Sequence, residues 1–128
     1  MDRQISKAID RSRAAMDEAL KRRLNPDMHV RHFRAFGRDA SVYYVEGVVS
    51  VDFLQQYVLK PLALLRDVEI EEPLTEAVHA AVYNCDVQTA STIPEAVVQM
   101  MNGRAVVFVD GMNCAMGFDV RMFVRRGI

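Results

Sequence analysis

Few residues of this 128-residue chain are of a type that carries chemistry, and their spacing forms none of the common catalytic or metal-binding motifs. His29 and His32 are three residues apart in a segment predicted to be a β-strand. That spacing places them on opposite faces of a sheet, so they cannot chelate one ion together. Cys85 and Cys114 could add sulfur ligands, but the paired C-x-x-C and H-x₃-H spacings of zinc sites are missing. We therefore predict neither a structural metal nor a cofactor.

The candidate nucleophiles are equally scattered. Ser41, Ser50 and Ser91 lack the G-x-S-x-G context of a nucleophile elbow, and Ser50 is predicted to cap a helix instead. The six glycines are spread along the chain, so no phosphate-binding loop is predicted. A cysteine–histidine enzyme is a rival hypothesis, and it predicts an unusually reactive thiol at Cys85 or Cys114. We predict that the chain is not an enzyme.

Length and composition are typical of one soluble globular domain spanning residues 1–128. Hydrophobic residues make up 51% of the chain and charged residues 26%, which excludes a disordered tail. No apolar run approaches the roughly 18 residues of a membrane helix, and the first residues lack the apolar core of a secretory signal. With only two cysteines, a disulfide framework is not expected and a reducing compartment is favoured.

Charge is distributed unevenly although the net charge is only −1. Seven acids and no Lys or Arg lie between Asp67 and Gly103, so the rest of the chain carries a net charge of +6. A solvated exterior is the simpler interpretation. The alternative is a pair of opposed patches that orient the domain against partner proteins. Nucleic acid is not expected as a partner, because the pI is about 6.3 and no aromatic residues accompany the basic ones. The candidate contact residues are Arg11, Arg13, Arg22, Arg23, Glu71 and Glu72.

The first half of the chain predicts a helix, a hairpin and two further helices. Apolar residues at 3–4 spacing over Gln4–Leu24 predict an amphipathic helix that ends before Pro26. Segments Met28–Phe36 and Ala40–Gly47 are rich in Val, Phe and Tyr and predict a hairpin with its turn at 37–39. The second of these strands is apolar on both faces, which predicts an interior position in the sheet.

A helix beginning at Ser50 is expected to kink or restart at Pro61. Next come an acidic link, 67–72, and a shorter helix over Thr75–Tyr83.

The second half predicts a strand, a helix and two more strands, with a right-handed parallel crossover between the first two strands. A Thr-x-x-Glu capping box begins the helix, and an Asn-Gly pair ends it. An Asp-Gly pair predicts the turn between the last two strands. The boundaries are Asp86–Ala90, Thr92–Gly103, Arg104–Val109, Asp110–Gly111 and Cys114–Val124.

The predicted fold class is therefore α/β, with a mixed sheet of about five strands flanked by helices in the order α-ββ-α-α-βαββ. In such sheets ligands favour the carboxyl ends of parallel strands. An alternative to a docking function is thus a small-ligand sensor that binds in a cleft with an adjacent subdomain. The ligand edge would be formed by Ala90, Ser91, Asp110 and Gly111.

The ordered set of segments resembles the soluble amino-terminal region of the GerA family of spore germination proteins, from about Met16 to Ile128. This family comprises the A subunits of germinant receptors and their SpoVAF relatives. The segments that carry the resemblance are Val30-Arg-His-Phe-Arg-Ala-Phe-Gly, Val42-Tyr-Tyr-Val-Glu-Gly-Val-Val, Asp52-Phe-Leu-Gln-Gln-Tyr-Val-Leu-Lys-Pro-Leu, Ser91-Thr-Ile-Pro-Glu, Asn102-Gly103, Ala105-Val-Val-Phe-Val-Asp-Gly and Asp119-Val-Arg.

The resemblance implies a domain at the cytoplasmic face of the inner spore membrane, in a full-length protein that is membrane-embedded. It implies other germinant receptor subunits, or copies of the same protein, as partners. Relatives continue past Ile128 into a second soluble subdomain, so this chain would be the first. The implied function is a non-catalytic docking and assembly module that couples nutrient sensing to ion release during germination.

Overall fold

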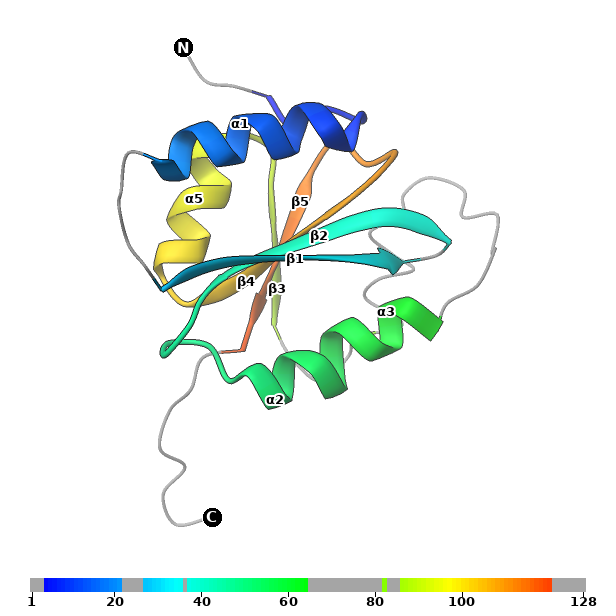
Figure 1. The fold of residues 1–128 in the computed structure, drawn as a ribbon, viewed down its shortest axis with the longest axis vertical. Helices are drawn as coiled ribbons and strands as arrows, with labels where there is room; N and C mark the ends of the chain where they lie inside the picture. Colours follow the sequence, from blue (N-terminus) through cyan, green and yellow to red (C-terminus); the bar gives the residue numbers. More distant parts are fainter. Residues whose placement is uncertain (1–3, 22–26, 36, 65–81, 83–85, 121–128) are drawn as a thin grey trace.

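The computed structural model describes residues 4–21, 27–35, 37–64, 82 and 86–120. Its five strands form one sheet in the order β1-β2-β4-β5-β3, with α1 and α5 on one face and α2 to α3 on the other (Figure 1). The elements are α1 (Ile9–Lys21), β1 (Met28–Ala35), β2 (Arg38–Val45), α2 (Val51–Leu54), the π-helical turn η1 (Gln55–Leu59), α3 (Lys60–Leu64), β3 (Val87–Ala90), α5 (Ile93–Met101), β4 (Arg104–Val109) and β5 (Ala115–Asp119).

The predicted α/β class, the five strands and the order of the described elements are confirmed, but the strand pairing differs in one respect. All four pairs of neighbouring strands are antiparallel. The crossover strands β3 and β4 do run in the same direction, because both are antiparallel to β5. They are not neighbours, since β5 folds back beside β4 and occupies the place between them. The parallel strands of the predicted mixed sheet therefore never pair directly.

Helix α1 begins at Ile9 rather than at Gln4, which corrects the predicted boundary. The preceding residues extend along the end of the sheet, where Gln4 forms an isolated bridge with Thr92. The backbone N–H of Ile5 donates to the carbonyl oxygen of Ser91 at 3.0 Å. Residues 4–8 are held by these tertiary contacts, so the 3–4 apolar spacing there does not produce a helical turn. The predicted end, at 22–24, lies outside the described residues.

The hairpin turn is tighter than predicted. Ala35 pairs directly with Arg38, so Arg38 and Asp39 belong to β2 and not to the turn. Gly37 lies in the turn with a φ of 72°, a conformation that glycine adopts without steric cost. Strand β2 is buried from Ala40 to Val45, as its two apolar faces predicted, and it lies between β1 and β4.

The segment after the hairpin is helical from Val51 to Leu64. The Ser50 hydroxyl accepts a hydrogen bond from the backbone N–H of Phe53 at 3.4 Å, which confirms the predicted cap. The interruption expected at Pro61 takes the form of the π-helical turn η1, after which α3 begins at Lys60. Proline has no N–H to donate within a helix, so a change of helical geometry just before it has a direct cause.

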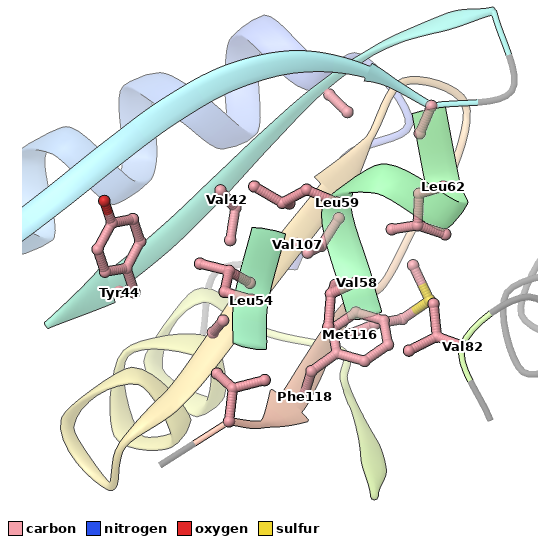
Figure 2. Close-up of a cluster of buried hydrophobic side chains, with 14 of the residues drawn as sticks. Val42, Tyr44, Leu54, Val58, Leu59, Leu62, Val82, Val107, Met116 and Phe118 are labelled. Carbon is pink, nitrogen blue, oxygen red and sulfur yellow. The ribbon is translucent and has the colours of Figure 1, made fainter. Parts of the chain in front are cut away.

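Two apolar clusters, one on each face of the sheet, hold the layers together. Figure 2 shows the cluster beneath α2–α3, in which side chains from the helices meet those from β2, β4 and β5. The other cluster packs α1 and α5 on the sheet and includes an edge-to-face contact of Tyr43 and Phe108 with ring centroids 5.5 Å apart. Fully buried members include Val42, Leu54, Val58, Leu62, Val107, Met116 and Phe118 in the first cluster, and Met16 and Met100 in the second.

The Thr92 cap and the glycine turns of the second half are confirmed, although the Glu95 carboxylate accepts from the Thr92 hydroxyl at 3.1 Å and not from the Thr92 backbone N–H of a full capping box. The Thr92 hydroxyl accepts from the backbone N–H of Glu95 at 3.3 Å. Gly103 and Gly111 have φ values of 95° and 94° at the helix end and in the β4–β5 turn. The predicted helix over Thr75–Tyr83 lies outside the described residues except for Val82, and so does the predicted last strand beyond Val120.

Replacing Leu62 by alanine tests the core beneath α3. The side chain is fully buried, so we expect Leu62→Ala to lower the free energy of unfolding by about 2–5 kcal/mol. Leu64→Ala, in the same helix and 68% exposed, is the matched control and should change it by less than about 0.5 kcal/mol. Urea unfolding followed by circular dichroism measures both. Equal effects would contradict the assigned core.

Candidate functional site

The most extensively hydrogen-bonded polar side chain in the described structure is Arg13, which fastens α1 to β2. Its two terminal nitrogens donate to the two carboxylate oxygens of Asp39 at 2.8 and 2.9 Å. Its Nε donates to Ser41 Oγ at 2.7 Å, and a terminal nitrogen also reaches the Ala40 carbonyl oxygen at 3.2 Å. The Arg13 side chain is only 18% exposed and faces into the protein. We call Arg13, Asp39 and Ser41 the α1 clamp.

The electrostatics of the α1 clamp follow from this geometry. The hydrogen bonds from Arg13 lower the pKa of the Asp39 carboxyl below its ordinary value, and they raise the pKa of Arg13. The Asp39 side chain is 48% exposed, so solvent screens part of this attraction. On the same face, burial raises the pKa of the Tyr43 hydroxyl. The clamp therefore keeps one ion pair charged at the boundary between α1 and the sheet.

Ser41 lies next to a histidine, but the pair cannot act as an accessible nucleophile and base. The residue is fully buried, and His32 Nδ1 lies 2.7 Å from its hydroxyl oxygen. Because the Arg13 Nε is always a donor, Ser41 Oγ accepts from it, and the hydroxyl hydrogen can point to His32. His29 lies on the other face, stacked on Tyr44, which confirms that the two histidines are separated by the sheet.

The predicted contact residues divide into three groups. Arg11 is exposed on α1. Arg13 is turned inward as the centre of the α1 clamp. Its place four residues after Ile9 and three before Met16 was a local signal for this orientation, but its partners, 26 to 28 residues away, were not predicted. The remaining four, Arg22, Arg23, Glu71 and Glu72, lie outside the described residues.

The predicted ligand edge is brought together by the fold, but the protein's own amino-terminal segment occupies it. Ala90 is fully buried at the end of β3, and Ser91 accepts the Ile5 hydrogen bond described above. The N–H of Gly111 donates to the Lys7 carbonyl oxygen at 2.8 Å. These backbone groups are thus used within the chain.

Asp110 is used in the same way. Its carboxylate oxygen Oδ1 accepts from the N–H of Ile9 at 3.2 Å, which caps the first turn of α1 from another loop. Its carbonyl oxygen accepts from Arg38 at 3.2 Å, and its N–H donates to the Asp39 carbonyl oxygen at 2.8 Å. The Asp-Gly pair was predicted as a turn and as part of a ligand edge, and no local signal predicted that Asp110 would cap a helix about a hundred residues earlier.

A second polar clamp joins strands at the other end of the sheet, on the face that carries α1 and α5. Arg104 donates to the Asp86 carboxylate at 2.7 Å, to the Gly117 carbonyl oxygen at 2.9 Å and to the Asp86 carbonyl oxygen at 3.3 Å. It therefore connects β4, β5 and the residue that precedes β3.

Residues of the types that bind metals do not gather in the described part of the chain. Within those residues there is no group of three or more His, Cys, Asp or Glu side chains placed to hold an ion. Cys114 is half-buried, and Cys85 lies outside the described residues. Among the described helices, none has both the length and the apolar character needed to cross a bilayer.

Comparison with known proteins identifies the family. The model of the Bacillus/Clostridium GerA spore germination proteins matches residues 14–128. The chain belongs to the GerA family. The resemblance noted in the sequence is thereby confirmed for residues 14–128, a range that includes Asp39, Ser41 and Arg104 but begins one residue after Arg13. No curated protein matches the chain.

A solved structure of a GerA protein has the same fold. The chain is similar to the crystal structure of the N-terminal domain of the A subunit of the Bacillus megaterium spore germinant receptor GerK3, with a TM-score of 0.77 and 19% sequence identity. The similarity covers 96% of this chain and 50% of that chain, so this chain spans about half its length. At this identity the likeness extends to the fold alone.

Replacing Arg13 tests whether it is a structural residue. Arg13→Ala leaves Ser41 and Asp39 without their charged donor, and we expect it to lower the free energy of unfolding by about 1–3 kcal/mol. Arg11→Ala removes an exposed arginine from the same helix and should leave it within about 0.5 kcal/mol. Chemical denaturation distinguishes the two, and a smaller effect at position 13 than at position 11 would refute the clamp.

The Asp39 carboxyl makes the clamp sensitive to acid. Because its pKa is lowered in the folded protein, its stabilisation is fully present above the unfolded value of about 3.9 and is lost as the pH falls through the lower folded value. Asp39→Asn should therefore unfold more easily than the wild type at pH 6, with the difference shrinking towards pH 3. Thermal melting across this range is the measurement. A difference that stayed constant with pH would contradict the assignment.

Proposed function

We propose that this chain is a non-catalytic docking and assembly module of a spore germinant receptor complex. In this proposal it lies at the cytoplasmic face of the inner spore membrane as part of a membrane-embedded protein. It contacts other receptor subunits, or copies of itself, and couples nutrient sensing to ion release. Residues 1–128 form one domain in this proposal, corresponding to the first subdomain of the soluble amino-terminal region.

One observation carries the non-catalytic part of the proposal. The polar side chains best suited to chemistry are used to hold helices and strands together. Ser41 is buried beneath Arg13, and Asp110 caps α1. A substrate would have to displace α1 to reach the Ser41 hydroxyl. Membership in the GerA family, and the likeness to a domain of a germinant receptor A subunit, support the receptor context.

Contacts with partners are assigned to the charged exterior. Arg11 is exposed on α1, and Arg22 and Arg23 follow this helix in the sequence. Glu71 and Glu72 belong to the stretch of opposite charge. Basic and acidic surfaces that face complementary partners fix orientation and increase association rates more than they increase affinity. Arg13 is not needed for this role, because its charge is already paired inside the domain.

The ligand-sensing alternative receives less support. Its edge at Ser91, Asp110 and Gly111 would become available only if residues 4–9 detached from the sheet. Ile5 and Ile9 are both buried, so detachment would also expose apolar surface.

Charge reversal in the full-length protein tests the docking proposal. We expect Arg11→Glu combined with Arg22→Glu and Arg23→Glu to reduce co-purification of the other receptor subunits and to slow nutrient-triggered germination. The loss should be larger at low salt than at high salt, because screening weakens contacts between exposed charges.

Lys60→Glu is the control, a single charge reversal on the exposed surface of α3 at the opposite face of the sheet. Circular dichroism of the isolated domain establishes that each variant is folded. Unchanged assembly and unchanged germination of the folded triple variant would overturn the assigned contact surface.

A further inference from the structure

Strand β1 is the outermost strand of the sheet, and its unpaired edge differs from that of the opposite outer strand. Its inner edge pairs with β2 over all eight residues, Met28–Ala35. No described strand pairs with its outer edge. Strand β3, at the other end of the sheet, has only four residues. An edge of eight residues offers enough unpaired backbone groups to template an additional strand.

Most of the structural features that block strand addition are missing from β1. The register with β2 is continuous from the Met28–Val45 pair to the Ala35–Arg38 pair, so there is no bulge. The strand contains neither proline nor glycine. Three consecutive residues, Val30, Arg31 and His32, are exposed, so neither face is covered at its centre. The feature of this edge that does oppose the addition of another strand is the positive charge of Arg31 and Arg34.

That charge selects among partners instead of excluding all of them. Strand β1 has no acidic residue. Two copies that paired through this edge would bring their basic side chains together, which disfavours self-association. An acidic strand would instead place opposite charges across the new ladder. The two arginines project from opposite faces, since Arg31 shares its face with Phe33 in the α2–α3 cluster, and Arg34 shares its face with His32 on the α1 side.

We propose that the outer edge of β1 accepts an extended acidic segment of a partner protein as a sixth strand. Its recognition element is a pair of acidic residues three positions apart, which places one carboxylate opposite Arg31 and the other opposite Arg34. Backbone hydrogen bonds supply the affinity of such strand addition, and the alternating side chains supply the specificity. This inference rests on the proposed docking function and identifies the surface and the chemistry of the partner segment.

A synthetic peptide tests this edge directly. The probe is the octapeptide Thr-Val-Glu-Thr-Val-Glu-Thr-Val, with its ends blocked, titrated into the isotope-labelled 128-residue chain. We expect amide resonance shifts concentrated in β1 and slower hydrogen exchange of those β1 amides that face outward. A peptide with lysine at both glutamate positions should bind at least about tenfold more weakly, because two attractive cross-strand pairs become repulsive. The glutamate peptide with alternate backbone amides methylated should lose binding, since it cannot complete the ladder.

Two matched double variants complete the test. Arg31→Glu with Arg34→Glu should reverse the preference in favour of the lysine peptide while the β2 and β4 amide resonances remain in place. Lys21→Glu with Lys60→Glu makes the same change in net charge at exposed positions elsewhere and should preserve binding of the glutamate peptide.

Equal binding of the two peptides, shifts centred on α1 or α5, or no binding at millimolar peptide would overturn the proposal, the last by showing that the arginines only protect the edge. Receptor assembly that remains sensitive to Arg11 after such a result would leave the docking function intact on another surface.

Discussion

The structure is organised around a strand that has to be covered on both faces. Strand β2 alternates between the two apolar clusters, with Val42 and Tyr44 on one side and Tyr43 and Val45 on the other. A strand of this kind is stable only inside a sheet that carries helices on both surfaces. The exception within its buried stretch is Ser41, whose hydroxyl would be costly to bury without a partner. The α1 clamp gives this hydroxyl a hydrogen-bond partner, which offsets the free-energy cost of burying it. It also attaches the helix that covers this face of the sheet.

The polar side chains of the clamps and of the Asp110 cap therefore mainly stabilise the fold. The α1 clamp, the Asp110 cap and the Arg104 connections join segments that are far apart in the sequence. Each uses charged or capping groups whose hydrogen bonds are among the stronger ones in proteins. Among the described residues, exposed charges such as Arg11 and the outer edge of β1 are still available for recognition. This division is consistent with a GerA-family domain that acts through protein contacts.

Local sequence patterns predicted the parts of the fold that have local causes. The Thr92 cap, the Gly103 helix end and the buried β2 strand follow from short-range chemistry and were predicted correctly. The predicted start of α1 was wrong, because Gln4 and Ile5 are held by contacts with a strand end some 90 residues away. Strands β3 and β4 run in the same direction as predicted, but no local pattern predicted that β5 would lie between them.

The functional residues show the same limit. Helical spacing separates Arg11 from Arg13, because Arg13 lies four residues after Ile9 and three before Met16 on the apolar stripe, whereas Arg11 lies on the opposite face. That spacing turns Arg13 towards the sheet, but the position of β2 beneath α1 decides that its partners are Asp39 and Ser41. The edge of β1 is likewise a property of strand order, which no local pattern in residues 28–35 encodes. The sequence predicted that a charged exterior forms the contact surface. It did not predict which residues form that surface.

We infer that this domain acts through its exterior while its polar interior stays fixed. Hydrogen exchange tests this most directly when it is measured both on the isolated chain and on the full-length protein within the assembled receptor. We expect exchange to slow on assembly in β1 and in the exposed face of α1, and to stay unchanged in β2 and in the Asp110–Gly111 turn. Identical exchange of β1 and α1 in both states, together with altered exchange at Ser91 and Asp110 when nutrient is added, would contradict it.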